Sequence, residues 1–159
     1  DAIVHVVRCF KDENVVHVDG DVNPIRDVET INYELMLADI ETIDKRLAKT
    51  ESLIKADKKY IQEKELLQRF KKNLEEGKML SSMQLNEYEA EYLHKAQLLT
   101  SKPYIYVANV GEDQTAGNEY SKQLDEFDKY DDTHDLTSEE LSYYLEVQSR
   151  VLKKLSEIQ

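Results

Sequence analysis

The stretch YIYVANV, residues 104–110, decides the fold of this chain. It consists mainly of β-branched and aromatic residues, which favour a β-strand. A second run of this kind, AIVHVV at 2–7, lies far upstream. It is apolar almost throughout, which is typical of a strand covered on both faces. Two apolar strands separated by a helical crossover predict a parallel α/β sheet.

The residues between the two runs have a helical pattern. Asp27 is the predicted N-cap of a long first helix, in which apolar residues recur with the spacing of a coiled-coil seam. Because Asp57 falls on this seam and residues 56–59 are polar, we expect a turn there. A second helix should end at Gly77 and pack antiparallel on the first. The seam is interpreted as packing rather than as a ligand site, and its residues are Met36, Ile40, Ile43, Leu47, Ile54, Ile61, Leu67, Phe70 and Leu74.

Further helices are expected before and after the second strand. Asn86, with Glu89 three residues later, has the spacing of a capping box, and Lys102-Pro103 should end the helix that follows. Residues 118–130 form a weaker helical pattern. A last helix is predicted to begin at Thr137 or Ser138.

Composition narrows the class of protein. Charged residues make up 34% of 159 residues, with four Gly and two Pro, which favours long helices. The net charge of −12 argues against general nucleic-acid binding and gives no support for specific DNA binding. Cys9, the single cysteine, fits a reducing cytoplasm. No apolar run approaches bilayer length, so we expect no membrane partner.

Three blocks of sequence carry a resemblance to a known family. They are DAIVHVVRCF at 1–10, ENVVHVDGDVNPIRDVETINYELMLADIETIDKRL at 13–47 and LLTSKPYIYVANVGED at 98–113. In this order they resemble the YchF/Obg-like ATPase family, of the P-loop GTPase class, over about residues 1–125. The resemblance implies an internal piece of that family's nucleotide domain: a partial P-loop nucleotide-hydrolase sheet of two parallel strands, with a long antiparallel coiled-coil insertion, mostly helical overall.

The resemblance also implies a division of the chain. Residues 1–27 would be a partial nucleotide-binding domain and 28–80 the coiled-coil insertion. Residues 81–130 would return to the nucleotide domain through a helix, a strand and the base-recognition loop. Residues 131–159 would form a divergent helical tail, in which a strand of the family is expected to be deleted.

Asn109-Val110-Gly111-Glu112 matches the family's base-recognition loop, in its Asn-x-x-Glu form. The amide of Asn109 can bond a purine edge, and Val110 can add an apolar contact. Glu112 stands where GTPases have the Asp that clamps guanine. The resemblance therefore implies preference for ATP, or weak discrimination between ATP and GTP. Without the resemblance, these are ordinary turn residues at a strand end.

His17 aligns with a histidine of the family. Such a residue near a phosphate could orient the attacking water or stabilise developing charge. The alternative is a loop histidine that is exposed or packed against the sheet. His94 and His134 lack ligand-like spacing, so no zinc site is expected.

The chain departs from the family in the parts that hold phosphates. It contains neither Gly-x-x-x-x-Gly-Lys-Ser/Thr nor the Asp-x-x-Gly of the second switch. The intact family uses ATP, or GTP, with Mg²⁺. Since phosphoryl transfer depends on positioning and charge neutralisation, we expect no useful hydrolysis by this chain alone.

Two functions remain open. The family implies a ribosome partner, and residues 44–64 hold seven bases against four acids, so Lys55, Lys58 and Lys59 are the candidate contacts with RNA phosphates. A solvated helix face of mixed charge is the alternative. The second function is a helical coiled-coil interaction module that binds no nucleotide. In either case exposed strand edges favour self-association.

Overall fold

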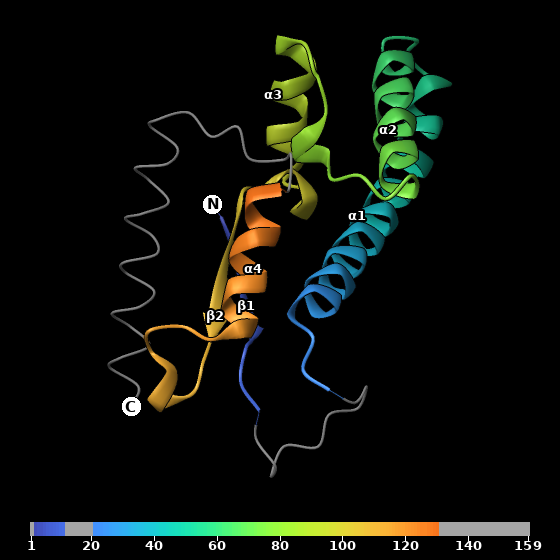
Figure 1. Ribbon diagram of the computed structural model, residues 1–159. Coiled ribbons are helices and arrows are strands. Elements are labelled where there is room, and N and C mark those ends of the chain that lie inside the picture. Colours follow the sequence, from blue (N-terminus) through green and yellow to red (C-terminus); the bar gives the residue numbers. More distant parts are fainter. Residues whose placement is uncertain (1, 12–20, 131–159) are drawn as a thin grey trace.

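The structure is a computed structural model, and it describes residues 2–11 and 21–130. The described part is mostly helical, with one small sheet (Figure 1). The tail at 131–159, including the helix predicted to begin at Thr137 or Ser138, lies outside it. The elements are β1 (Ile3–Arg8), α1 (Pro24–Ile54), α2 (Tyr60–Glu75), η1 (Leu80–Ser82), α3 (Glu87–Ala96), η2 (Leu99–Ser101), β2 (Tyr104–Asn109), η3 (Glu112–Gln114) and α4 (Glu119–Tyr130), where η denotes a 3₁₀ turn.

β1 and β2 form a parallel pair, as the sequence predicts. The register places Arg8 opposite Asn109, so both strands end at the same edge. On one face, Val7 packs with Val28 of α1 and Leu124 of α4. Val6 points to the other face and is 53% exposed. The prediction that this strand is covered on both faces is therefore wrong within the described residues.

Helix α1 begins four residues earlier than Asp27 would require. Asn23 is the N-cap, and its side-chain oxygen accepts a hydrogen bond from the Arg26 N–H at 3.1 Å. Pro24 follows at the first helical position, where its fixed φ suits a helix start. Asp27 instead lies in the first turn, where a negative charge is favoured by the helix dipole.

Helices α1 and α2 run antiparallel, and the predicted turn separates them (Figure 1). Asp57 stabilises this turn by accepting the Lys59 N–H at 2.9 Å. Ile43 and Phe70 are fully buried in the seam. Ile61 is 40% exposed, so its predicted place in the seam is wrong. The spacing of apolar residues in α1 does not predict which residues of α2 are buried. After the turn, α2 begins with a different rotation about its own axis.

Helix α3 has the predicted capping box: Asn86 accepts the Glu89 N–H, and Glu89 accepts the Asn86 N–H, each at 3.0 Å. The helix ends earlier than predicted, at Ala96 rather than near Pro103. Gln97 adopts a left-handed conformation with φ of 54°, which stops the helix. The chain then makes the turn η2 before it enters β2.

A polar cluster attaches α3 to the α1–α2 pair. Glu63 of α2 accepts hydrogen bonds from the Tyr92 hydroxyl at 2.9 Å and the Thr50 hydroxyl at 3.3 Å. Burial, helped by the bond to Glu63, raises the pKa of Tyr92 to about 12. Arg69 of α2 also makes a two-pronged ion pair with Glu89 of α3, at 2.6 and 3.0 Å. The three helices therefore pack as one body.

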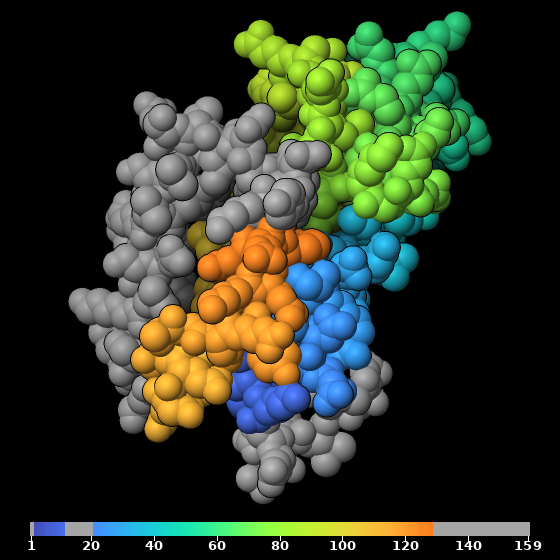
Figure 2. Space-filling view, viewed as in Figure 1, coloured from blue at the N-terminus to red at the C-terminus, as the bar shows by residue number. Residues whose placement is uncertain are grey.

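The described residues contain two apolar cores. The sheet core lies between β1, α1 and α4 and comprises Val7, Cys9, Val28 and Leu124. The arm core lies farther along α1. It comprises Met36, Ile43, Leu66, Leu67, Phe70, Leu74, Met79, Leu80, Leu93, Ala96 and Leu98. We call residues 36–98 the arm. Figure 2 shows it as the cyan-to-yellow-green part that projects from the orange helix and the blue start of α1.

Among the elements that the structure describes, helix α1 alone contributes to both cores, so it joins the arm to the sheet. Within residues 2–11 and 21–130, no helix is both long enough and apolar enough to cross a membrane.

Candidate functional site

The edge at which β1 and β2 end brings together residues from distant parts of the chain. The backbone N–H of Cys9 donates to the carbonyl of Asn109 at 2.7 Å, which extends the pairing one residue beyond β1. The side chain of Asn109 is exposed, as binding a ligand requires. Arg8 lies directly across from it. In α/β proteins, ligands commonly bind at the edge where the carboxyl ends of parallel strands meet.

The loop after β2 begins at this edge and enters the turn η3 within a few residues. Val110 is half-buried and packs against the sheet core. Glu112 is exposed and begins η3. A Cβ on Gly111 would lie 3.0 Å from the carboxylate of Asp113, so a side chain there would displace that group. The candidate residues Asn109, Val110 and Glu112 thus lie on one short loop at the strand ends.

Asn118 holds the loops of this edge together, a role that the sequence does not reveal. Its side-chain N–H groups donate to the carbonyl of Cys9 at 2.5 Å and to Gln114 at 2.6 Å. Its oxygen accepts the Ser121 N–H at 2.9 Å, which caps α4. One side chain therefore joins the end of β1, η3 and the start of α4. An Asn before a helical pattern indicates only the cap.

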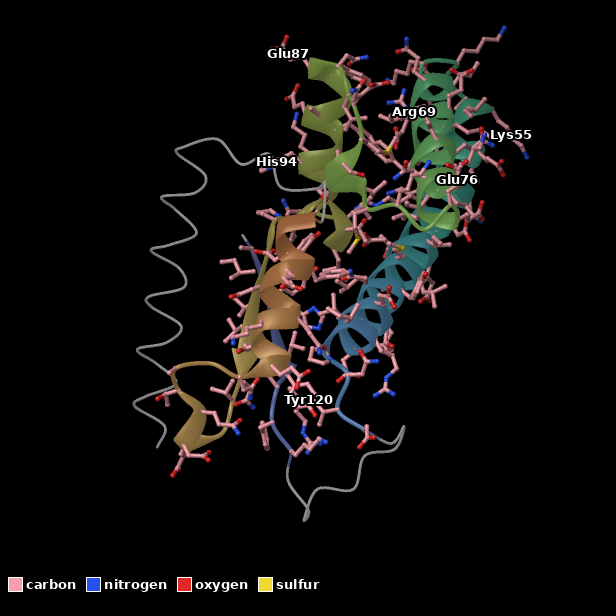
Figure 3. All side chains as sticks on the ribbon, viewed as in Figure 1. Lys55, Arg69, Glu76, Glu87, His94 and Tyr120 are labelled. Carbon is pink, nitrogen blue, oxygen red and sulfur yellow. The ribbon has the colours of Figure 1, made fainter. Side chains whose placement is uncertain are left out.

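Two cations lie on the β1 side of the edge. The Arg8 side chain donates to the carbonyl of Phe10 at 3.1 Å, and its guanidinium lies 4.9 Å from the centre of the Phe10 ring. A hydrogen bond with Tyr120 raises the pKa of Lys11, so its ammonium stays charged at neutral pH. Figure 3 shows Tyr120 at the end of the molecule opposite the arm. The edge thus offers positive charge beside the amide of Asn109.

The predicted parts differ in how they fit a nucleotide. The exposed amide of Asn109, beside Arg8, has both the donor and the acceptor that bonding a purine edge would require. Among the residues that the structure describes, no three His, Cys, Asp or Glu side chains are grouped so as to hold a metal ion, so none is assigned to Mg²⁺. His17 lies outside the described residues.

The candidate RNA contacts lie at the turn between α1 and α2, where Lys55, Lys58 and Lys59 are all exposed. Figure 3 shows Lys55 on the arm, far from Tyr120. Lys59 pairs with Asp57 at 2.9 Å, and its ammonium lies 5.1 Å from the centre of the Tyr60 ring. Lys59 is therefore partly neutralised, and Lys55 and Lys58 are the better placed to meet a phosphate.

Comparison with a solved structure defines the class of protein. The structure of the Schizosaccharomyces pombe YchF GTPase matches with a TM-score of 0.68 and 31% identity, over 79% of this chain and 36% of that chain. The predicted fold class is confirmed: the chain has the two parallel strands and helical insertion of a P-loop GTPase fold.

Sequence comparison finds similar proteins with the names of one family. The ribosome-binding ATPase YchF of Bacillus subtilis strain 168 is 46% identical over 131 residues, 80% of this chain and 36% of the relative. The protein of the same name from Escherichia coli O157:H7 is 39% identical over 127 residues, 79% and 35% of the two chains. Obg-like ATPase 1 of Saccharomyces cerevisiae strain S288c is 53% identical over 55 residues, 35% and 14%.

The predicted resemblance is thereby confirmed: about four fifths of the chain is homologous to a segment of the YchF/Obg-like ATPase family. The chain spans about a third of the length of these YchF relatives. No model of a known protein family matches it.

Proposed function

We propose that this chain is the base-recognition and helical-arm part of a ribosome-associated nucleoside triphosphatase, with the purine bound where β1 and β2 end. One observation supports this most: the pairing of Arg8 with Asn109, which sets an exposed amide beside a cation at the edge of a parallel sheet. Relatives over the same residues are named ribosome-binding ATPase and GTPase. We also propose that the protein works in the cytoplasm.

In the proposed complex, Asn109 bonds the purine edge. Its backbone oxygen is engaged by Cys9, so the loop is fixed while the side chain stays exposed. Val110 offers the exposed part of its side chain to the base. Glu112 replaces the Asp that clamps guanine, which favours ATP over GTP or leaves the two poorly distinguished. Arg8 and Lys11 add positive charge near the ligand.

Titration with fluorescent ATP tests this site. Replacing Asn109 by Ala removes the hydrogen bonds to the base and should weaken binding roughly tenfold, the effect of losing about 1.4 kcal/mol. Gln68→Ala is the matched control, because it removes an exposed amide from the arm. If the wild-type chain binds ATP and both variants bind equally well, Asn109 does not contact the base.

We also propose that the chain alone hydrolyses little ATP, since its sequence lacks the phosphate-binding loop. His17 is proposed to act on the attacking water in the intact family, where ATP or GTP is bound with Mg²⁺. Release of labelled phosphate by this chain well above the buffer rate would overturn the proposed lack of hydrolysis.

The tip of the arm is proposed to bind ribosomal RNA. Exchanging Lys55, Lys58 and Lys59 for Gln should weaken co-sedimentation with ribosomes. It should also flatten the dependence on salt, by about 0.7–0.9 in log–log slope for each phosphate that the tip no longer neutralises. Exchange of three exposed lysines elsewhere, Lys72, Lys95 and Lys122, changes the net charge equally and is the control. Equal weakening in both variants would point to general charge rather than to the tip.

A helical interaction module is the alternative, favoured by the separate core of the arm. It predicts no ATP binding in the titration above. We further propose that the outer edges of β1 and β2, each with one strand partner among the described residues, allow copies to associate. The proposed division is 1–27 and 81–130 for the nucleotide domain, 28–80 for the insertion and 131–159 for the tail.

A further inference from the structure

Asp39 is a buried acidic residue in the middle of α1, with its side chain turned towards the chain that leads into β2. It is 2% exposed. One carboxylate oxygen accepts the Leu99 N–H at 2.8 Å. The other accepts the Thr100 N–H at 2.7 Å and the Thr100 hydroxyl at 2.6 Å. A buried carboxylate is tolerated only when donors of this kind surround it, so the three bonds fix one geometry.

These bonds join two of the stretches that carry the family resemblance, 13–47 and 98–113. Thr100 belongs to η2, and β2 begins at Tyr104. Asp39 therefore holds the turn from which β2 starts, and β2 ends at Asn109. Asp39 itself belongs to α1, an unbroken helix of 31 residues that is about 46 Å long at 1.5 Å per residue. That helix reaches the lysines of the tip.

A second bond attaches α1 to the same return segment. The guanidinium of Arg46, two turns along the helix, donates to the carbonyl of Ala96 at 2.6 Å. This satisfies a backbone oxygen at the end of α3. Arg46 is only partly buried, however, and it donates one hydrogen bond to Ala96, whereas the buried Asp39 accepts three. Asp39 is thus the stronger of the two attachments.

We propose that Asp39 is a positioning residue that couples the orientation of the arm to the strand leading to the base-recognition loop. The inference rests on the proposed function for the meaning of the two ends, but the attachment itself can be measured separately. A partner that tilts the arm would shift η2 and β2 through Asp39, and a nucleotide at the strand ends would resist that shift. Binding at the two ends is then energetically linked.

The first experiment measures arm orientation. Spin labels on Lys55→Cys at the tip and Lys122→Cys on α4 report their distance distribution by double electron–electron resonance. Cys9 is fully buried and escapes labelling in the folded chain. In Asp39→Asn, an amide N–H group replaces the carboxylate oxygen that accepts hydrogen bonds from Thr100, so those bonds are lost. The distribution of distances between the two labels should then broaden or shift. Thr100→Val, which removes only the hydroxyl, should do so less, and Thr100→Ser should resemble wild type.

A general decrease in stability must be separated from a decrease in coupling. Phe70→Leu weakens the arm core without touching the attachment, and it should leave the distance distribution unchanged. An unchanged distribution in folded Asp39→Asn, or the same broadening in Phe70→Leu, would overturn the proposal. Thr100→Val keeps the test valid if Asp39→Asn does not fold.

The second experiment measures fluorescent-ATP affinity in the same variants. Asp39→Asn should raise the dissociation constant at least about fivefold, the lower end of typical coupling between sites, and Phe70→Leu less than about twofold. Equal affinities in wild type and Asp39→Asn would overturn the coupling. If wild type binds no ATP, the proposed function fails, and the distance measurement alone decides whether Asp39 orients the arm.

Discussion

Two side chains, Asp39 and Asn118, hold together segments that lie far apart in the sequence. The position of Asn109 at a strand end could be predicted from the strand-like residues before it. Asp39 could not, because an acidic residue in a helical pattern is ordinarily solvent-facing and its partners, Leu99 and Thr100, lie far along the chain. Asn118 was recognisable only as a helix start. Hydrogen bonds between distant segments leave no local pattern.

His5 makes the stability of the fold depend on pH. Burial lowers the pKa of His5 below its usual 6.5, and the nearby Asp27 offsets part of that change. Above pH 6.5 the imidazole is neutral in both the folded and the unfolded chain. As the pH falls through 6.5 the unfolded chain binds the proton first, so the free energy of unfolding decreases towards the lower folded-state pKa.

Urea unfolding of wild type and His5→Phe between pH 7.5 and 5 measures this contribution. Phe keeps a ring next to Tyr106, whose centre lies 5.6 Å from that of His5, but it cannot be protonated. The wild type should lose more stability than the variant across this range. Carboxylates that titrate near pH 5 affect both chains alike, so parallel curves would show that His5 contributes nothing.

Among the elements, those specified by neighbouring residues were predicted best. The capping box of α3 and the turn at 56–59 depend on side chains a few positions apart. Helix ends at which several start or stop signals compete were not predicted. Pro24 fixes the start of α1, and Gln97 ends α3 in a conformation that few non-glycine residues adopt. The buried face of α2 could not be predicted from the spacing in α1, because a turn separates the two helices.

The capping box permits a test at this scale. Asn86→Ala removes the acceptor for the Glu89 N–H, and the loss of such a cap costs about 1 kcal/mol. The free energy of unfolding from urea titration should fall by about that amount. Gln84→Ala, an exposed position just before the helix, is the control and should change stability by less than about 0.5 kcal/mol. A smaller effect at Asn86 than at Gln84 would contradict the role of the cap.

At the scale of the whole molecule, the two cores of the described residues share one helix, so its parts should open separately. Leu67→Ala in the arm core and Leu124→Ala in the sheet core remove the same side chain, at a typical cost of about 2–5 kcal/mol each. In native-state hydrogen exchange, Leu67→Ala should speed exchange mainly in α2 and α3, and Leu124→Ala mainly in β1, β2 and α4. Identical exchange patterns would show a single cooperative unit.

The pairing of β1 with β2 has a consequence for synthesis of the chain. Helices α1 and α2 follow each other directly in the sequence, whereas Arg8 must wait for Asn109. At about 5–20 residues per second, β1 leaves the peptidyl-transferase centre roughly 5–20 s before its partner exists. The arm can fold in that interval and bring the strand ends closer, which shortens the loop still to be closed. In pulse-labelling of amide hydrogens during refolding, the amides of α2 should accordingly become protected before those of β1. During synthesis, the unpaired β1 is a segment that a chaperone could bind.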